Sequence, residues 1–466
     1  MPYSNESVYT GEYNKEPDLN FDLYAEELCR IAIKATYKSE EAFTVGIFGS
    51  WGSGKTTLMR RIKAILENED IFKQLFIDGK QLTKEEEFKP KKRKIIWFNP
   101  WKYDSKEDTR NALIQVILIE ISNDTKLDVD KRKKIMEKAL TFGWSMAKLS
   151  GHIGRGVIKT ATLGSIDTEY ISKEIEKAFQ QEDKPTINPY QILNNFEEDF
   201  RNIVLDCVDK NGRLIVFIDD LDRCLPENAL AVLESLKLYL SQVNCIFFIG
   251  LDKRVIEQAV SQRYKDIKIT GKEYIEKIIR LNFFLPDKDP KEVGKIFERV
   301  PMIIGNYDIQ GQPTQKEKEE VEKLWNMILA ATQANLRKVE QFIIAFELIE
   351  KIVEGINKKI NPAQASEKIK WKENYPMLAK VLLIQMNFPD FYDALEKNHT
   401  LMEQIQKIYN LNNNGDEDAK LKAVQDKYPS WSDPLLIKFI VDHFEYGKIS
   451  NSNDWKIIHK LSVIYE

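Results

Sequence analysis

One short segment constrains the fold of this chain more than any other. It consists of Gly49, Ser50, Trp51, Gly52, Ser53, Gly54, Lys55 and Thr56. These residues match the pattern G-x-x-x-x-G-K-[ST] at every position. The apolar run at residues 44–48 predicts a buried strand before the loop, and apolar residues at helical spacing over 58–66 predict a helix after it. A strand, a glycine loop and a helix in this order form the context in which such a loop binds phosphate.

The residue types in the loop suit a nucleotide with its metal ion. Glycines let successive backbone N–H groups point inward at phosphate oxygens, and the helix that follows adds the positive end of its dipole. Lys55 is expected to reach the β- and γ-phosphates, and the Thr56 hydroxyl to hold Mg²⁺. We therefore predict ATP and Mg²⁺ as cofactors, bound by every residue from Gly49 to Thr57.

A magnesium nucleotide also needs a carboxylate on a neighbouring strand. The apolar residues 214–218 predict that strand, and Asp219 and Asp220 follow it directly. Asp219 is expected to orient the metal together with Thr56, and Asp220 to polarise the attacking water as general base. Asp222 is expected to cap the next helix, since Pro226 lies close behind it.

The doubled acid favours hydrolysis over transfer. P-loop kinases and GTPases usually carry one carboxylate at this place, whereas ATPases of the additional-strand class pair it with a catalytic acid. The segment Thr125-Lys126-Leu127-Asp128 matches the guanine-reading pattern [NT]-K-x-D, but it precedes Asp219, and in GTPases it should follow. This order favours ATP over GTP.

The remaining pattern predicts an α/β fold, in which a parallel β-sheet is flanked by helices. Further strands are expected at 95–98, 213–218 and 245–250, with a helix at 227–240 between the last two. Strands alternating with helices imply a parallel sheet covered on both faces. We expect four regions: a first part of the P-loop NTPase domain over 1–122, a helical insertion over 123–190, a second part of the domain over 191–288, and an α-helical C-terminal domain over 289–466.

Composition narrows the class of partner. The net charge of −4, from 69 basic and 73 acidic residues, gives no overall attraction to nucleic acid. The four cysteines are far apart and suggest neither a zinc ribbon nor a disulfide framework. The N-terminus lacks the pattern of a secretory signal, and no apolar run is long enough to span a membrane. A cytoplasmic protein is therefore expected.

Several motifs resemble those of the KAP family of P-loop NTPases, a branch of the STAND-like ATPases of the additional-strand class. The resemblance covers roughly residues 17–346. It rests on F-G-S-W-G-S-G-K-T-T-L at 48–58 with its Trp51, F-N-P-W-K-Y at 98–103, D-D-L-D-R-C at 219–224, F-F-I-G-L-D-K-R-V-I-E-Q-A-V at 247–260 and Y-I-E-K-I-I-R-L-N-F-F-L-P at 274–286.

The resemblance implies two further residues that sense the nucleotide. Asp252 stands where sensor 1 contacts the γ-phosphate or its water, although it also suits a cap for the helix that begins near Arg254. Arg337 resembles the sensor-2 arginine that a helical domain places over the phosphates. The family usually shows N-P-R there, and Leu336 replaces the proline, so a solvated arginine on a helix face is the competing interpretation.

The resemblance also makes Arg223 a candidate arginine finger that acts across a subunit interface, because a guanidinium stabilises the phosphoryl transition state. An ion pair of Arg223 with Asp222 or Glu227 is an equally good interpretation. Trp97 and Trp101 flank an apolar strand, which favours packing over base stacking for both.

Many KAP proteins carry two transmembrane helices between the two nucleotide motifs, and here this chain departs from the family. Residues 142–164 are too charged to span a bilayer, since they include Lys148, His152, Arg155 and Lys159. Because the basic run 131–134 precedes them, residues 131–164 could lie on an anionic inner membrane or contact a partner protein. Their charge content favours a soluble helical hairpin.

The function that these residues predict is an ATPase that acts as a switch. Nucleotide binding or hydrolysis would reposition the helical domain, with homo-oligomerisation on activation and a protein partner whose identity is open. The resemblance suggests antiphage defence or signalling, since the family includes bacterial proteins that exclude phage. Two alternatives stay open: a nucleotide-sensing scaffold that does not hydrolyse, and a nucleic-acid-stimulated ATPase, which the charge balance disfavours.

Overall fold

The chain forms two compact units, Met1–Pro286 and Asp287–Glu466, and each is described by itself. The computed structural model describes residues 21–36, 41–77, 92–104, 109–150, 189–238, 240, 244–265, 270–286, 293, 315–360, 368–411, 416–449 and 452–461.

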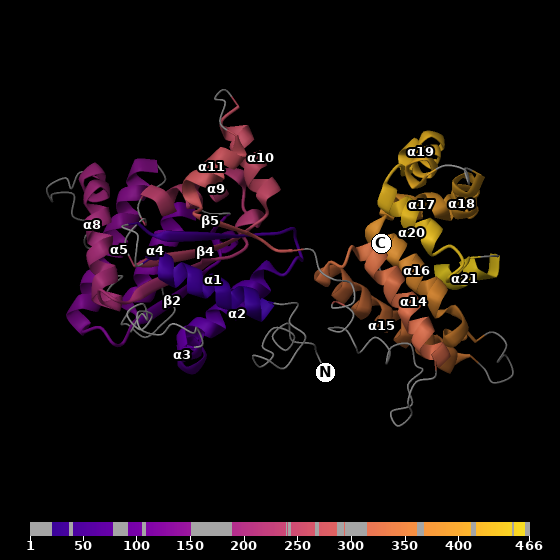
Figure 1. Cartoon of the computed structure of the whole chain (residues 1–466), viewed down its shortest axis with the longest axis horizontal. Helices are drawn as coiled ribbons and strands as arrows, with labels where there is room; N and C mark the ends of the chain where they lie inside the picture. The colour runs from indigo at the N-terminus through magenta and orange to yellow at the C-terminus, as the bar shows by residue number, and fades with distance from the viewer. Residues whose placement is uncertain are drawn as a thin grey trace. The chain divides into compact units, whose positions relative to one another are not determined.

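A five-stranded sheet forms the centre of the first unit (Figure 1). Its strands are β1 (Phe43–Phe48), β2 (Arg93–Phe98), β3 (Arg213–Ile218), β4 (Cys245–Leu251) and β5 (Leu281–Phe284). All neighbouring strands pair in parallel, in the order β2-β3-β4-β1-β5. The predicted parallel sheet is confirmed. β4 lies between β1 and β3.

Burial along the strands follows from their positions in the sheet. Every residue of β3 and β4 is buried, which is typical of central parallel strands covered on both faces. The edge strands β2 and β5 are only partly buried. β5 has four residues and is not among the predicted strands, because its edge position gives it no continuous apolar run.

Helices cover both faces of the sheet (Figure 1). α1 (Phe21–Thr36) and α2 (Lys55–Glu67) pack together on one face, and α3 (Glu69–Ile77) follows α2. On the other face, α4 (Thr109–Ser122), α8 (Pro189–Val208) and α9 (Pro226–Leu238) share a buried core with alternate residues of β3. The unit is completed by α10 (Lys253–Arg263), α11 (Gly271–Ile278) and the short 3-10 helices η2 (Pro100–Tyr103) and η3 (Leu221–Arg223).

Within residues 123–190, where an insertion is predicted, the structure describes one long helix. α5 (Val129–Ser150) packs against α4 and α8. Lys131 pairs with Asp206 at 2.9 Å, and Lys138 pairs with Asp199, so basic residues of α5 meet acidic residues of α8. Residues 151–188, which include most of the charged segment 142–164, lie outside the described residues. Among the described helices, none is both long and apolar enough to cross a membrane.

The second unit is helical over its described residues, which confirms the predicted α-helical C-terminal region. Its helices are α14 (Gln315–Thr332), α15 (Leu336–Lys359), α16 (Trp371–Asn387), α17 (Pro389–Lys397), α18 (Leu401–Leu411), α19 (Glu417–Lys427), η5 (Pro429–Trp431), α20 (Pro434–Asp442) and α21 (Ser452–Leu461). α16 packs against α14, α15 and α17. It carries the buried Lys380, whose ammonium donates to the Phe444 carbonyl at 3.1 Å.

Candidate nucleotide site

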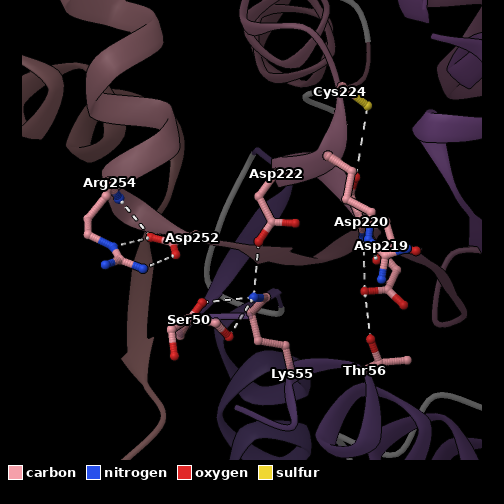
Figure 2. A network of polar contacts seen from close by, with 11 residues as sticks. Ser50, Lys55, Thr56, Asp219, Asp220, Asp222, Cys224, Asp252 and Arg254 are labelled. Carbon is pink, nitrogen blue, oxygen red and sulfur yellow. Dashed lines mark hydrogen bonds and ion pairs between the residues drawn. The ribbon is translucent and has the colours of Figure 1, made fainter. Parts of the chain in front are cut away.

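The polar residues of interest gather where four parallel strands end. Gly49 follows β1, Asn99 follows β2, Asp219 follows β3 and Asp252 follows β4. Since the strands are parallel, all four residues lie at the same edge of the sheet, where open α/β sheets bind their ligands. Figure 2 shows Asp219 and Asp252 together with Ser50, Lys55 and Thr56 of the glycine loop.

The glycine loop has the backbone that its sequence predicts. Gly52 has φ 75° and Gly54 has φ 100°, values that an L side chain rarely adopts. Gly54 precedes the first residue of α2, so no side chain caps the N–H groups at the start of this helix. A Cβ at Gly54 would also lie 2.7 Å from the ring of Phe21. This turn therefore requires glycine and leaves a helix N-terminus suited to an anion.

Lys55 is buried at the centre of the loop, where its ammonium makes two hydrogen bonds and one ion pair. Its ammonium donates to the Gly49 carbonyl at 2.8 Å and to the Ser50 carbonyl at 3.2 Å. It also pairs with Asp222 Oδ2 at 3.0 Å, as Figure 2 shows. The two carbonyls take two of the three donors of the ammonium. The contact with Asp222 is an ion pair, because the buried Asp222 Oδ2 accepts no hydrogen bond.

Asp222 does not take the capping role expected from the sequence. Its side chain is 2% exposed and faces Lys55. Another acid accepts the hydrogen bond just before α9: the Leu225 N–H donates to the Asp104 carboxylate at 3.1 Å. The Asn228 amide donates to the same carboxylate at 2.8 Å.

Asp219 meets Thr56, the pair predicted to hold the metal. The Thr56 hydroxyl donates to Asp219 Oδ1 at 3.1 Å, and the backbone N–H of Asp220 donates to the same oxygen at 3.0 Å. Burial, together with the charge of Asp220, raises the pKa of Asp219 to about 6. An acid that ionises reluctantly next to a hydroxyl is one that a bound cation would stabilise.

These residues fit a magnesium ion that arrives with a nucleotide. Within the described part of the chain, no group of three or more His, Cys, Asp or Glu side chains could hold a metal ion by itself. Mg²⁺ commonly takes only one or two protein ligands and completes its octahedron with phosphate oxygens and water. Thr56 and Asp219 supply such a partial set.

Asp220 is held by two neighbours. It adopts a left-handed backbone conformation with φ 58°. Its Oδ2 accepts a hydrogen bond from the Asn99 amide at 2.9 Å, and its Oδ1 pairs with Arg223 Nε at 2.8 Å. Both carboxylate oxygens therefore have a partner, and the predicted pairing of Arg223 with Asp222 or Glu227 is wrong.

Arg223 also lies close to two tryptophans at the surface. Its guanidinium carbon is 5.3 Å from the ring centre of Trp101 and 5.9 Å from that of Trp51. Both rings are about half exposed. The packing role predicted for Trp101 is therefore wrong. The one predicted for Trp97 is right, because Trp97 stacks on Phe217 at 5.2 Å.

Asp252 takes the capping position that the sequence left open. It is the N-cap of α10, where it accepts the Arg254 N–H at 3.0 Å and pairs with Arg254 Nη2 at 2.7 Å. Burial of the carboxyl opposes its ionisation, but the bonds to Arg254 outweigh burial and hold the pKa of Asp252 below its usual value. A sensor-1 role stays a prediction.

Arg337 belongs to the second unit. It lies on an exposed face in the first turn of α15, next to the N-cap Asn335, whose side chain accepts the Lys338 N–H at 3.3 Å. Its sensor-2 role stays a prediction.

Two residues of this network were missed from the sequence. Asn99 follows a predicted strand directly, and a polar residue at a strand end was a signal that could have identified it. Asp222 was recognised only as a helix cap, and its pairing with Lys55 had no local signal.

Known proteins are similar to this chain in sequence or in structure. A model of the KAP family P-loop domain matches residues 21–353. An uncharacterised protein of Methanocaldococcus jannaschii, MJ0182, is 22% identical over 160 residues, which cover 31% of this chain and 82% of that protein. The Aeropyrum pernix ORC2 protein, solved as ADPNP-ADP complexes, is 12% identical with a TM-score of 0.35 over 98% of each chain. Drosophila ORC bound to DNA is 11% identical with a TM-score of 0.34, over 99% of this chain and 86% of that one.

Proposed function

The chain belongs to the KAP family of P-loop proteins and binds nucleotide, and from this premise we propose that it hydrolyses ATP to ADP and phosphate. In this proposal the N–H groups from Gly49 to Thr57 and the Lys55 ammonium bind the phosphates. Thr56 and Asp219 hold Mg²⁺, which when bound would neutralise charge that develops on the phosphates. ATP rather than GTP is proposed from the sequence.

Asp220 is the proposed general base. The observation that carries the proposal is that the two acids after β3 contact different residues. Asp219 faces Thr56, whereas Asp220 points to Asn99 and Arg223. A second carboxylate held apart from the metal acid is what activation of a water requires. Asn99 and Arg223 then act as residues that orient Asp220.

Phosphate release from Mg-ATP by the purified chain tests hydrolysis. Asp220→Asn should bind nucleotide as the wild type does and release phosphate at least about a hundredfold more slowly, because the base is removed while the shape is kept. Lys55→Ala should lose nucleotide binding as well. Glu227→Gln, an exposed acid on α9, is the matched control and should behave as the wild type. Equal turnover by Asp220→Asn and wild type would refute the role of Asp220.

A second candidate function is a nucleotide-sensing scaffold without turnover. Two contacts favour it: the Lys55 ammonium is already paired with Asp222, and both carboxylate oxygens of Asp220 have a partner. Denaturing the purified protein and identifying the released nucleotide separates the two functions. Stoichiometric ADP or ATP, together with the absence of phosphate release under any condition, would establish the scaffold.

We also propose that nucleotide binding or hydrolysis switches the conformation of the chain and leads to homo-oligomerisation. Arg223 would act as an arginine finger across a subunit interface only after leaving Asp220, Trp51 and Trp101. The sensor roles of Asp252 and Arg337 belong to the same active state. Mass measurements in ATP, in ADP and without nucleotide test homo-oligomerisation, and an unchanged monomer in all three would refute it. A role in antiphage defence or signalling, a protein partner and a membrane contact through residues 131–164 are proposed by resemblance alone.

A further inference from the structure

The pairing of Lys55 with Asp222 has a consequence for nucleotide binding. The lysine side chain is 9% exposed and that of Asp222 is 2% exposed, so the ion pair is shielded from water. The Gly49 and Ser50 carbonyls take two of the three donors of the ammonium, and Asp222 Oδ2 lies 3.0 Å from it. A phosphate oxygen that binds Lys55 therefore comes close to the Asp222 carboxylate.

The charges indicate which acceptor is replaced. If Asp222 stayed, a phosphate and a carboxylate would share one ammonium and repel each other across a short distance in a dry site. If the phosphate replaces Asp222, the ammonium keeps one anionic partner. Asp222 occupies the place on Lys55 that a phosphate would take.

After this exchange, the buried Asp222 carboxylate would no longer be paired with the Lys55 ammonium. A buried carboxylate that loses its cation is strongly unfavourable. Repulsion between Asp222 and Asp219 adds to this cost, since the charges of Asp222 and Asp220 both raise the pKa of Asp219. Arg223 is engaged with Asp220 and Arg254 with Asp252. A compensating positive charge therefore has to come with the ligand, and the divalent cation of a metal-nucleotide complex supplies it.

We propose that Asp222 is a positioning residue that makes nucleotide binding at Lys55 depend on a divalent cation. In the nucleotide-free chain it holds Lys55 in the loop and blocks a nucleotide that arrives without metal. When a metal nucleotide binds, Lys55 passes from Asp222 to a phosphate, and the added cation balances the freed carboxylate. The inference rests on the proposed nucleotide site. It concerns the affinity of that site for nucleotide with and without a divalent cation, not the rate of hydrolysis.

Asp222→Asn in the full chain tests this inference. Asparagine keeps the shape and an oxygen acceptor for Lys55 but removes the charge. Fluorescence anisotropy of N-methylanthraniloyl-ADP and N-methylanthraniloyl-ATP measures the dissociation constants with Mg²⁺ and with EDTA. We expect the variant to bind both probes in EDTA at least about tenfold more tightly than the wild type, because no buried charge is left unpaired. The ratio of affinities with and without Mg²⁺ should fall by the same factor.

Glu227→Gln removes one negative charge from the neighbouring helix and should keep the wild-type ratio. Binding by Asp222→Asn in EDTA that is no tighter than wild-type binding would overturn the inference alone. If the wild type binds neither probe even with Mg²⁺, the proposed site fails, and the inference fails with it.

A measurement without nucleotide keeps the inference testable if Asp222→Asn folds poorly. Lys55→Met leaves Asp222 buried without its cation, and adding Asp222→Asn removes that charge. The double variant should therefore melt at a higher temperature than Lys55→Met. Melting shifts that simply add would show that the two side chains are not coupled, and would overturn the inference.

Discussion

Asp219→Asn should stabilise the nucleotide-free protein at neutral pH, although it removes the acid proposed to hold the metal. Burial first, and then the charge of Asp220, raises the pKa of Asp219 from 3.8 to about 6. The ionised carboxylate is therefore less favourable in the folded chain than in the unfolded chain. Asparagine removes this penalty and keeps an Oδ1 that accepts from Thr56 and from the Asp220 N–H.

The sign and size follow from linkage. Between pH 3.8 and about 6 the folded chain binds the Asp219 proton more tightly than the unfolded chain does. Protonation of Asp219 therefore adds to the free energy of unfolding in full below pH 3.8. This contribution declines as the pH rises toward about 6 and is absent above it. A shift of about two pKa units corresponds to about 3 kcal/mol. We expect the variant to be about 1 to 3 kcal/mol more stable at pH 7.5 and to lose this advantage by pH 4.

Native-state hydrogen exchange in EDTA, resolved to peptides from β1, β3 and β4, measures the stability of the first unit separately from the second. Comparing variant and wild type at the same pH cancels the intrinsic exchange rates. Asp130→Asn, an exposed carboxylate on α5, is the control and should change the free energy of unfolding by less than about 0.5 kcal/mol. The reasoning is refuted if Asp219→Asn is less stable than wild type at pH 7.5, or if its advantage is the same from pH 4 to pH 8.

Two further predictions concern other parts of the chain. Gly54→Ala should destabilise the first unit by at least about 1 to 3 kcal/mol and abolish nucleotide binding, because φ is 100° and a Cβ would lie 2.7 Å from the Phe21 ring. Melting and probe binding measure this, and Gly355→Ala, where nothing lies within 4 Å of a Cβ, should be neutral or stabilising. Lys380→Met should stabilise the second unit below pH 7, since burial lowers the pKa of Lys380 to about 7. Exchange of α16 peptides should show that this advantage shrinks as the pH rises toward 10.5, and a constant difference would refute the cause.

The sequence predicted those parts of the site that are local in the chain. The glycine loop and the two acids after β3 are contiguous motifs, and each is flanked by a strand whose apolar run is unmistakable. The partners of these residues are distant in the chain. Asn99 and Asp220 are 121 residues apart, and only the pairing of β2 with β3 brings them together.

Arg223 shows why a local argument can choose the wrong partner. Its sequence neighbours Asp222 and Glu227 are both acids at a reasonable spacing. The left-handed conformation of Asp220 and the 3-10 turn that follows it bring Arg223 back onto Asp220 instead. The same turn directs Asp222 inward to Lys55. Neither a turn type nor a strand order is encoded in the identity of the charged residues alone.

The four acids at this edge of the sheet differ in one respect that links stability to function. Asp222 is paired with Lys55, Asp220 with Arg223 and Asp252 with Arg254. Among the contacts of the described residues, Asp219 receives only a hydroxyl and a backbone N–H. Its pKa is raised, whereas that of Asp252 is lowered. Asp219→Asn would remove a penalty of about 1 to 3 kcal/mol, and a cation beside Asp219 would offset part of the same penalty. If Thr56 and Asp219 hold Mg²⁺ as proposed, part of the affinity for the metal comes from a carboxylate that has no cationic partner among the described residues.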